Sequence, residues 1–366
     1  MIATKTQRDL SLDSFRGINV LLMILVNVQG SDADAFRLLK HAEWNGLTFA
    51  DLVFPIFLLI VGLSAPLALD RPGVRTNWPA ILQKTLLLFM IGVGLSWFIK
   101  PTLDPDMIRW TGVLQRIAIV YLVCVCVMHI RRGAGLAIGL AVLLLAIHSW
   151  LLLKIGAPSG AGPSMEPGMG ISGWLDQNFI PGRVLRKTWE PEGILSTLPA
   201  IANGLIGVAI MRWSKNQNVT NMRLMFAGAV LLIAGVALMP VLPLNKNLWT
   251  ASFALVTCGV GTIVWAFLKN YWIIIGQNRI AKWTVNLGQS ALTLYVIHTL
   301  LIAVIVRKLP SGEKIWDVSY QMLASTGLPL PVASLLYACL AAAISCAILP
   351  WIKGKRALNT ALPPAP

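Results

Sequence analysis

The sequence has few charged residues, and it has few side chains that bind metals or form disulfides. Only 12% of its 366 residues are Asp, Glu, Lys or Arg, against about 25% in soluble domains. It contains four histidines and five cysteines, and every cysteine lies inside an apolar run with no metal-ligand spacing. These cysteines are typical of small buried hydrophobes, so the sequence predicts no metal site and indicates no redox compartment.

Long apolar runs dominate the rest of the chain. Hydrophobic residues make up 56% of it, and the mean hydropathy is +0.72. Crossing the hydrocarbon of a bilayer takes roughly 20 apolar residues, and runs of that length recur throughout. The sequence therefore predicts an all-α, polytopic integral membrane bundle that forms a single domain over 1–366. About ten spans are expected, at 12–28, 49–69, 79–99, 112–130, 134–154, 193–212, 222–240, 248–268, 287–306 and 331–351.

The net charge of +15 reflects basic residues in the loops, and we do not expect a nucleic-acid partner. Cytoplasmic loops of membrane proteins carry an excess of Lys and Arg, and this bias predicts that both termini are cytoplasmic. Asn27-Val28-Gln29 follows the first apolar run in place of a small-residue cleavage site, so that run is expected to remain as a helix. The outer loops then include the residues around His41, a short loop with Lys246, and a Gly- and Pro-rich segment at about 156–191. This long segment is a candidate lid.

The first apolar run begins and ends with polar residues. Asp13 and Arg16 are three residues apart, so they share a helix face and can form an ion pair. Alternatively, Arg16 binds a phosphate at the inner membrane face. Eleven residues separate Arg16 from Asn27, which is roughly 16 Å of helix axis and comparable to an extended pantetheine arm. Asn27 is either a helix cap or an amide that donates to a developing oxyanion.

A polar cluster is predicted after the first span, where His41, Asn45 and Asp51 precede the second. Polar side chains that lie within a membrane cost free energy, so they usually pair with one another or have a function. Histidine can serve as a general base near neutral pH, because its unperturbed pKa is about 6.5. Asp51 can fix the tautomer of the imidazole. Taken singly, His41 is as readily explained by a structural role, and so is His298, which lies in the middle of the ninth span.

Two more polar segments open outer helix ends. One contains Arg109 and Arg116, and the other contains Glu190 and Glu192 next to Trp189. Carboxylates beside an aromatic ring suit an aminated sugar, since they bind the ammonium while the ring packs on the sugar. The alternative for the glutamates is that they complement the dipole of a helix N-terminus.

Several of these motifs together resemble the heparan-alpha-glucosaminide N-acetyltransferase family and its bacterial relatives. The resemblance covers about the first 200 residues. It is carried by Ser11-Leu12-Asp13-Ser14-Phe15-Arg16-Gly17, Val26-Asn27, His41-Ala42-Glu43-Trp44-Asn45-Gly46-Leu47, Asp51-Leu52-Val53-Phe54-Pro55, Gly112-Val113-Leu114-Gln115-Arg116-Ile117 and Pro191-Glu192-Gly193-Ile194-Leu195-Ser196-Thr197.

The resemblance implies transfer of acetyl from cytosolic acetyl-CoA to a glucosamine amine across the membrane. It implies that His41 is the catalytic residue and that Asn27 takes part. The large N-terminal luminal region of the lysosomal members has no counterpart here, so we expect a small amino-sugar acceptor and a bacterial inner membrane. The expected acetyl-CoA ligands are Arg16, with Arg8, Arg71 and Arg75. The expected acceptor ligands are Trp44, Asn45, Asp51, Arg116, Glu190 and Glu192.

Two mechanisms and one rival function stay open at this point. Acetyl can pass directly to the amine, with His41 as base and Asn27 as oxyanion donor, or it can pass through an acetyl-His41 intermediate. Direct transfer is preferred because one base and one donor suffice. The rival is a transporter that uses the same cluster to bind an amino sugar or acyl group without chemistry. The sequence leaves open whether the protein forms a homo-oligomer.

Overall fold

A computed structural model of the protein describes residues 9–70, 76–130, 133–160, 162–276 and 278–353. In this part of the chain the regular elements are helical, which confirms the predicted all-α membrane bundle. The α-helices are α1 (Leu10–Asn27), α2 (Phe49–Leu69), α3 (Trp78–Ile99), α4 (Val113–Ile130), α5 (Ala134–Lys154), α6 (Gly170–Phe179), α7 (Ile194–Ser214), α8 (Asn221–Ala237), α9 (Ala251–Ile275), α10 (Arg279–Gly288), α11 (Ala291–Ile305), α12 (Ile315–Ala324) and α13 (Leu330–Lys353).

The number of spans differs from the ten that the sequence predicts. Within the described residues, eight helices are long and apolar enough to cross a membrane, namely α1 to α5, α7, α9 and α13. The ninth predicted span, at 287–306, corresponds to α11, and the structure adds the short helix α10 before it, with a bend of 76° between the two. The remaining predicted span, at 222–240, corresponds to α8, which is apolar but only 17 residues long. The apolar run there continues past Ala237 as turns that lead to Pro240.

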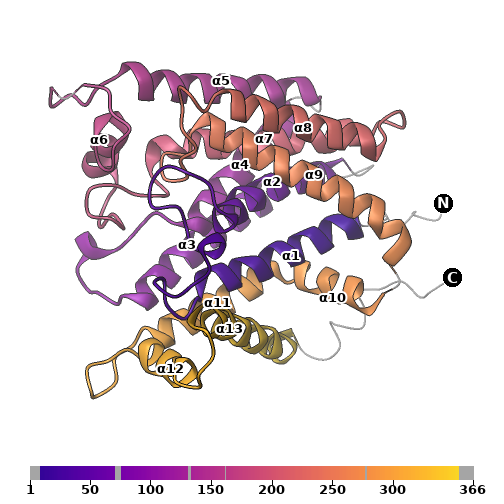
Figure 1. The fold of residues 1–366 in the computed structure, drawn as a ribbon. Coiled ribbons are helices and arrows are strands. Elements are labelled where there is room, and N and C mark those ends of the chain that lie inside the picture. The colour runs from indigo at the N-terminus through magenta and orange to yellow at the C-terminus, as the bar shows by residue number, and fades with distance from the viewer. Residues whose placement is uncertain (1–8, 71–75, 131–132, 161, 277, 354–366) are drawn as a thin grey trace.

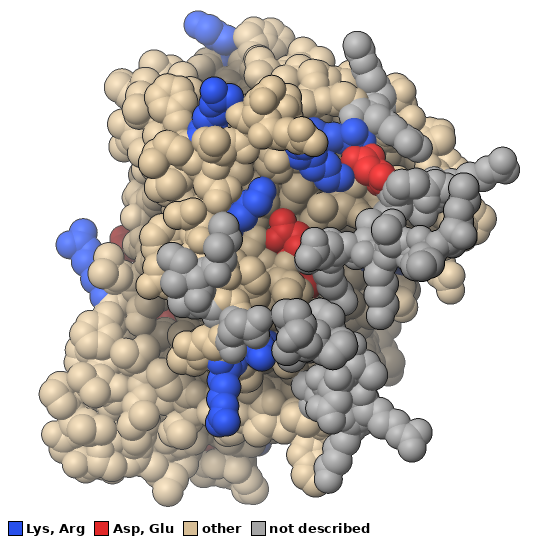
Figure 2. All heavy atoms as spheres, turned by 90° about the vertical axis from the view of Figure 1, so that its right-hand side faces the viewer, with Lys and Arg blue, Asp and Glu red and all other residues tan. Residues whose placement is uncertain are grey.

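Both ends of the described chain lie at the same end of the bundle, where α1 begins and α13 ends (Figure 1). Figure 2 looks onto that end, and among its described residues Lys and Arg are more conspicuous than Asp and Glu. Basic residues at helix ends include Arg212 in the last turn of α7 and Arg279 at the start of α10. The distribution follows the charge bias that underlies the predicted orientation.

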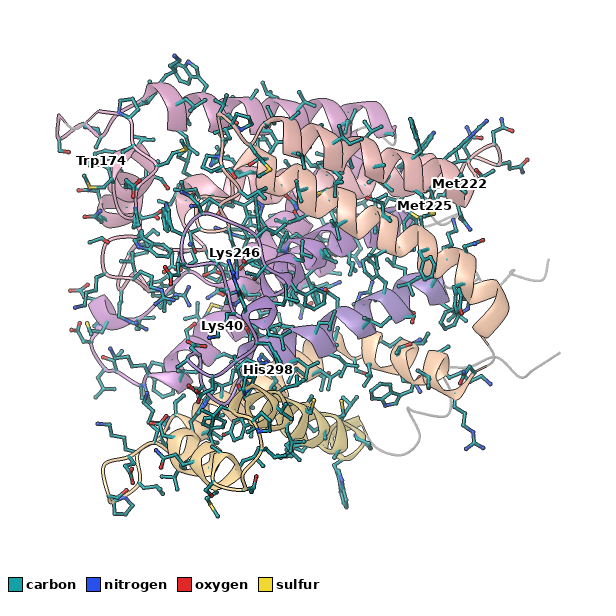
Figure 3. All side chains as sticks on the ribbon, in the orientation of Figure 1. Lys40, Trp174, Met222, Met225, Lys246 and His298 are labelled. Carbon is teal, nitrogen blue, oxygen red and sulfur yellow. The ribbon has the colours of Figure 1, made fainter. Side chains whose placement is uncertain are left out.

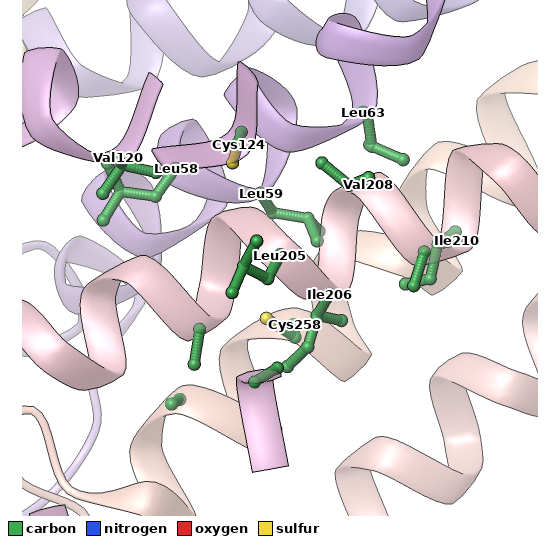
Figure 4. Packing of buried hydrophobic residues seen from close by; sticks show 14 of the residues in the cluster. Leu58, Leu59, Leu63, Val120, Cys124, Leu205, Ile206, Val208, Ile210 and Cys258 are labelled. Carbon is green, nitrogen blue, oxygen red and sulfur yellow. The ribbon is translucent and has the colours of Figure 1, made fainter. Parts of the chain in front are cut away.

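The helices form two apolar cores that share α1 and α2. The larger core joins the first half of α1 to α2, α4, α5, α7, α8 and α9. Figure 4 shows part of it, with Leu59 of α2, Cys124 of α4 and Leu205 of α7 in one cluster. Glycine allows α2 and α7 to touch, because a Cβ at Gly62 would lie 1.8 Å from the carbonyl oxygen of Gly204. Small residues at such contacts are typical of helices packed in membranes.

The second core joins α1, α10, α11 and α13 to the first turn of α2. A cavity borders both cores, since Ile117 packs against the first core and Val26 and Ala291 belong to the second. The fold therefore leaves an opening where two packed groups of helices meet. Several of the polar residues predicted from the sequence lie at this opening.

Candidate functional site

The cavity holds about 650 Å³, which is in the range of small-molecule sites. Its deep part is apolar and is lined by residues of five helices. They are Met23 and Val26 of α1, Val53, Phe54 and Phe57 of α2, Leu88 of α3, Val113, Leu114 and Ile117 of α4, and Ala291, Leu292 and Tyr295 of α11. Its polar part lies at the loops and contains Asn27, His41, Glu43, Asp51, Arg109, Arg186, Trp189, Glu192, Lys246 and Asn247.

His41 and Asp51 form a closely bonded polar pair in the cavity. Asp51 is the third residue of α2, where it makes a capping box with Thr48. One carboxylate oxygen, Oδ2, accepts from the backbone of Ala42 at 3.0 Å and from the backbone and hydroxyl of Thr48 at 3.1 and 3.0 Å. The other, Oδ1, lies 2.8 Å from Nδ1 of His41. With Nδ1–H donating to Asp51, the lone pair of His41 is on Nε2, and 44% of this side chain is exposed.

The loop after His41 docks a second loop onto the cavity. Asn45 and Gly46 bind the segment between α8 and α9: the Asn245 side-chain amide donates to Asn45 at 3.0 Å, and the Gly46 amide donates to the Leu244 carbonyl at 2.7 Å. Gly46 has a φ of 127°, which L side chains rarely adopt. These two residues therefore act by holding a neighbouring loop. Asn45 itself does not line the cavity.

Docking of this loop brings Lys246, which is labelled in Figure 3, beside the His41–Asp51 pair. Its Nζ lies 3.3 Å from Oδ1 of Asp51 and 3.0 Å from Nδ1 of His41. Burial lowers the pKa of Lys246, although the carboxylates of Asp51 and Glu192 raise it. Sequence reasoning missed this residue, because 205 positions separate it from His41 and it reads as an ordinary outer-loop charge. The polar run Asn245-Lys246-Asn247 between two apolar helices is the only signal.

Asn27 ends α1 at the rim of the cavity, and this residue is exposed. It lines the same cavity as His41 and Asp51. It also borders a second hollow, of about 710 Å³, between the end of α1 and α12. The structure thus brings together the asparagine and the histidine that were predicted to take part in catalysis.

Arg109 and two glutamates form an ion cluster at the opposite rim. Glu190 is fully buried and accepts hydrogen bonds from Nε and Nη2 of Arg109. Oε2 of Glu192 lies 2.6 Å from the same Nη2. Burial opposes the charge of Arg109, yet the two carboxylates raise its pKa above the ordinary value. Burial favours protonation of Glu190, but Arg109 keeps its pKa below the ordinary value. Burial raises the pKa of Glu192, although the positive charge of Arg109 lowers it.

Glu190 and Glu192 therefore occupy different positions, although both were expected to bind the acceptor. Glu192 lines the cavity, whereas Glu190 does not. Glu190 instead accepts from the backbone of Leu185 at 2.8 Å. The next helix is held by Asp176 of α6, whose carboxylate accepts from the amides of Glu190 and Ile194, each at 3.1 Å. Burial raises the pKa of Asp176 to about 6, although the hydrogen bonds from those two amides lower it.

Trp44, also expected at the acceptor, lies behind the cavity wall. The Trp44 indole donates to the Met165 carbonyl at 2.9 Å and packs edge-on against Trp189, with ring centroids 5.0 Å apart. Trp189 is the ring that lines the cavity, together with Leu185 of the same 156–191 segment. This segment, predicted as a candidate lid, therefore forms part of the wall.

Arg116, a further expected acceptor ligand, is 2% exposed and holds the start of α7. Its Nη2 donates to the Ser196 hydroxyl at 2.6 Å and to the Gly193 carbonyl at 3.2 Å. The guanidinium also lies 5.0 Å from the ring centroid of Trp249. These contacts make Arg116 a support for the helix that follows the Glu192 rim.

Arg16 lies in the second turn of α1, toward the end of the bundle where the chain begins. Nη1 donates to Asp13 at 2.8 Å and Nη2 to the Ser64 hydroxyl at 2.6 Å. The ion pair predicted from the sequence spacing is therefore present, and 21% of the Arg16 side chain is still exposed. The other expected acetyl-CoA ligands, Arg8, Arg71 and Arg75, lie outside the described residues.

The remaining titratable candidate, His298, is buried in α11. Its Nδ1 lies 3.1 Å from the carbonyl oxygen of Tyr295 in the same helix. His298 does not line the cavity, although Tyr295 does. Among the described residues no group of three His, Cys, Asp or Glu side chains is arranged to hold a metal ion.

Fold and site together define a polytopic helical membrane protein with a histidine–carboxylate pair in a cavity between its helices. Residues 8–164 match the family model described as "Heparan-alpha-glucosaminide N-acetyltransferase, catalytic". The chain is also similar to the heparan-alpha-glucosaminide N-acetyltransferases of Homo sapiens and Mus musculus. Both are 29% identical to it, over 306 residues for the human and 304 for the mouse protein. These comparisons confirm the resemblance to the heparan-alpha-glucosaminide N-acetyltransferase family.

The similarity extends over part of each protein. Each alignment covers 66% of this chain, and the chain spans less than half of those two relatives, 45% of the human and 46% of the mouse protein. The stretch matched by the family model contains Asn27, His41 and Asp51. Glu192 and Lys246, which also line the cavity, lie beyond it.

Proposed function

We propose that the protein is a transmembrane N-acetyltransferase that moves acetyl from acetyl-CoA to the amine of an amino sugar. The observation that carries the proposal is the His41–Asp51 pair, with Nδ1 and Oδ1 2.8 Å apart, inside a cavity that continues between the helices. A base oriented by a carboxylate suits the attack of an amine on a thioester. The similarity to two N-acetyltransferases supports the same reaction.

In this proposal His41 is the general base. The amine nitrogen attacks the thioester carbonyl carbon, Nε2 of His41 takes the amine proton, and the carbon–sulfur bond breaks. The coenzyme A thiolate leaves and takes up a proton from solvent. The Asn27 amide donates to the oxyanion of the tetrahedral intermediate. Direct transfer is preferred over an acetyl-His41 intermediate, because this set of groups completes the reaction in a single displacement.

The two substrates approach from opposite ends. Acetyl-CoA enters at the cytoplasmic end, with its phosphates at Arg16, and Arg8, Arg71 and Arg75 are the further ligands proposed from the sequence. Its pantetheine arm follows the apolar part of the cavity, which is lined down to residues such as Leu88 in the middle of α3. The amino sugar enters from the opposite side, where the loops around His41 and Glu192 lie. The membrane in this proposal is the inner membrane of a bacterium.

The whole chain forms one transmembrane domain in this proposal, and the 156–191 segment covers the acceptor entrance. Glu192 accepts a hydrogen bond from the sugar amine, which is neutral when it attacks, and Trp189 packs on the sugar ring. Glu190 has a different task here, since it fixes Arg109 and thereby the position of Glu192. Trp44, Asn45 and Arg116 support the walls of the acceptor site, as their contacts indicate.

The direct test uses the purified full chain with labelled acetyl-CoA and glucosamine. We expect labelled N-acetylglucosamine and free coenzyme A in equal amounts. A transporter would give glucosamine uptake into vesicles without acetylated product, and that result would replace this proposal. His41→Ala is the control for acetylation that does not depend on the cavity.

A further inference from the structure

Lys246 contacts both members of the His41–Asp51 pair. Its Nζ lies 3.3 Å from Oδ1 of Asp51, and 3.0 and 3.5 Å from Nδ1 and Nε2 of His41. Only 20% of this side chain is exposed. The loop that carries it is fixed by Asn45 and Gly46, so the contact follows from the fold of the His41 loop.

The three groups compete for one hydrogen-bonding position. An ammonium is a donor only, so Lys246 can bond to Nδ1 of His41 only when that nitrogen carries no proton. The proton of the neutral ring is then on Nε2, and His41 cannot accept a proton there. When both Lys246 and Nδ1–H donate to Oδ1 of Asp51, all three groups are satisfied and Nε2 keeps its lone pair.

The charges decide which form of His41 is present. A carboxylate 2.8 Å away stabilises an imidazolium, and an imidazolium cannot act as a base. A nearby cation has the opposite effect, because like charges disfavour the charged form. With Lys246 in place, the carboxylate is matched by an ammonium and the ring can stay neutral.

Other charged groups face the same cavity. Glu43 belongs to the His41 loop, Glu192 and Arg109 to the opposite rim, and Arg186 to the 156–191 segment. Arg109 is engaged by Glu190 and Glu192. Tyr295 of α11 adds a neutral phenol. Lys246 is distinguished from these by its contact with both His41 and Asp51.

We infer that Lys246 is a positioning residue that offsets the charge of Asp51, so that His41 remains neutral with its proton on Nδ1. The inference rests on the proposed function and deepens it. In the resting site the ammonium, the carboxylate and the neutral ring sum to zero charge. When Nε2 takes the amine proton, the site gains one positive charge, and that proton passes on to solvent after the coenzyme A thiol has left.

The test follows His41 itself with diethyl pyrocarbonate, which modifies the neutral imidazole. The modified His41 peptide is measured by mass spectrometry across pH in the wild type, Lys246→Gln, Lys246→Arg and the control Lys40→Gln. Lys40 lies nearby, but its side chain bonds to the Ala33 carbonyl outside the cavity. The pH of half-modification should rise by about one pH unit or more in Lys246→Gln. The pH of half-modification should be the same as in the wild type in Lys246→Arg and in the control.

Acetyl transfer is measured on the same samples. At a pH well below the half-modification pH of the wild type, Lys246→Gln should be about tenfold slower than the wild type, because raising the half-modification pH by one unit leaves about tenfold less neutral imidazole there. At pH 8.5 the two should be nearly equal. If Lys246→Gln is poorly folded, Lys246→Cys is compared before and after aminoethylation, which restores a cation on the folded protein.

The two possible failures are distinguishable. If the wild type forms product but the half-modification pH of Lys246→Gln is unchanged, or Lys246→Arg responds as Lys246→Gln does, the inference about Lys246 is wrong and the proposed function stands. If the wild type forms no product while the half-modification pH still rises in Lys246→Gln, the proposed function fails and the charge relationship stands.

Discussion

Nδ1 of His41 lies 2.8 Å from Oδ1 of Asp51, and the two residues come from different sides of a helix start. His41 is in the loop before α2, whereas Asp51 is in the first turn of α2, where its carboxylate closes a capping box with Thr48. The helix cap therefore fixes the carboxylate that the histidine engages. The loop gains its position from the same carboxylate, through the amide of Ala42 at 3.0 Å.

The first prediction concerns this pair. Asp51→Asn should reduce kcat by roughly 10²-fold or more, within the 10²–10⁴-fold range of general-base catalysis. The amide can no longer orient the ring and satisfy the Thr48 donors together. The affinity for acetyl-CoA, measured by calorimetry, should be unchanged. A normal kcat in a folded Asp51→Asn protein would show that His41 acts without its carboxylate.

The second prediction concerns Asn27 and His41 acting in one transition state. Asn27→Ala should cost roughly 10²–10³-fold in kcat if its amide stabilises the oxyanion. Groups that act as a unit are non-additive, so the double variant with His41→Ala should be less impaired than the product of the two single losses. Single-turnover rates on all four proteins measure this. Fully multiplicative losses would mean that Asn27 has a separate role, for instance at the second hollow that it borders.

The third prediction separates the two glutamates. Glu192→Gln should raise KM for the amino sugar, because this carboxylate lines the cavity. Glu190→Gln should instead lower the melting temperature, because it removes one partner of a buried ion pair, a change that costs about 3–5 kcal/mol. Equal effects of the two changes on KM and on melting temperature would contradict the division of roles.

The sequence could indicate only part of this arrangement. The helices follow from apolar runs, and the His41, Asp51 and Asn27 cluster follows from polar residues at adjacent helix ends. It could not separate Glu190 from Glu192, because burial against Arg109 depends on the path of a distant loop. Lys246 could not be assigned for the same reason, since its position depends on the docking of its loop to the His41 loop.

The count of spans shows a similar limit. Hydropathy marks an apolar stretch but not where its helix bends or ends. The 76° break between α10 and α11 and the early end of α8 at Ala237 are therefore visible only in the structure.

The fourth prediction concerns the far end of α1. Arg16→Ala should weaken acetyl-CoA binding by about 1–3 kcal/mol, the range for hydrogen bonds to charged groups, while kcat at saturating donor changes little. Arg212→Ala is a matched control, since it breaks an ion pair with Asp70 at the same end of the bundle. Unchanged affinity in a folded Arg16→Ala protein would mean that Arg16 has a structural role and does not bind acetyl-CoA.

The central claim is acetyl transfer between substrates on opposite sides of a membrane through His41. The most direct measurement uses proteoliposomes with labelled acetyl-CoA sealed inside and glucosamine outside, prepared with the wild type, with His41→Ala and without protein. The account predicts labelled N-acetylglucosamine outside the wild-type vesicles only, with coenzyme A retained inside. Product at the wild-type rate with His41→Ala, or product only when both substrates share one side, would contradict it.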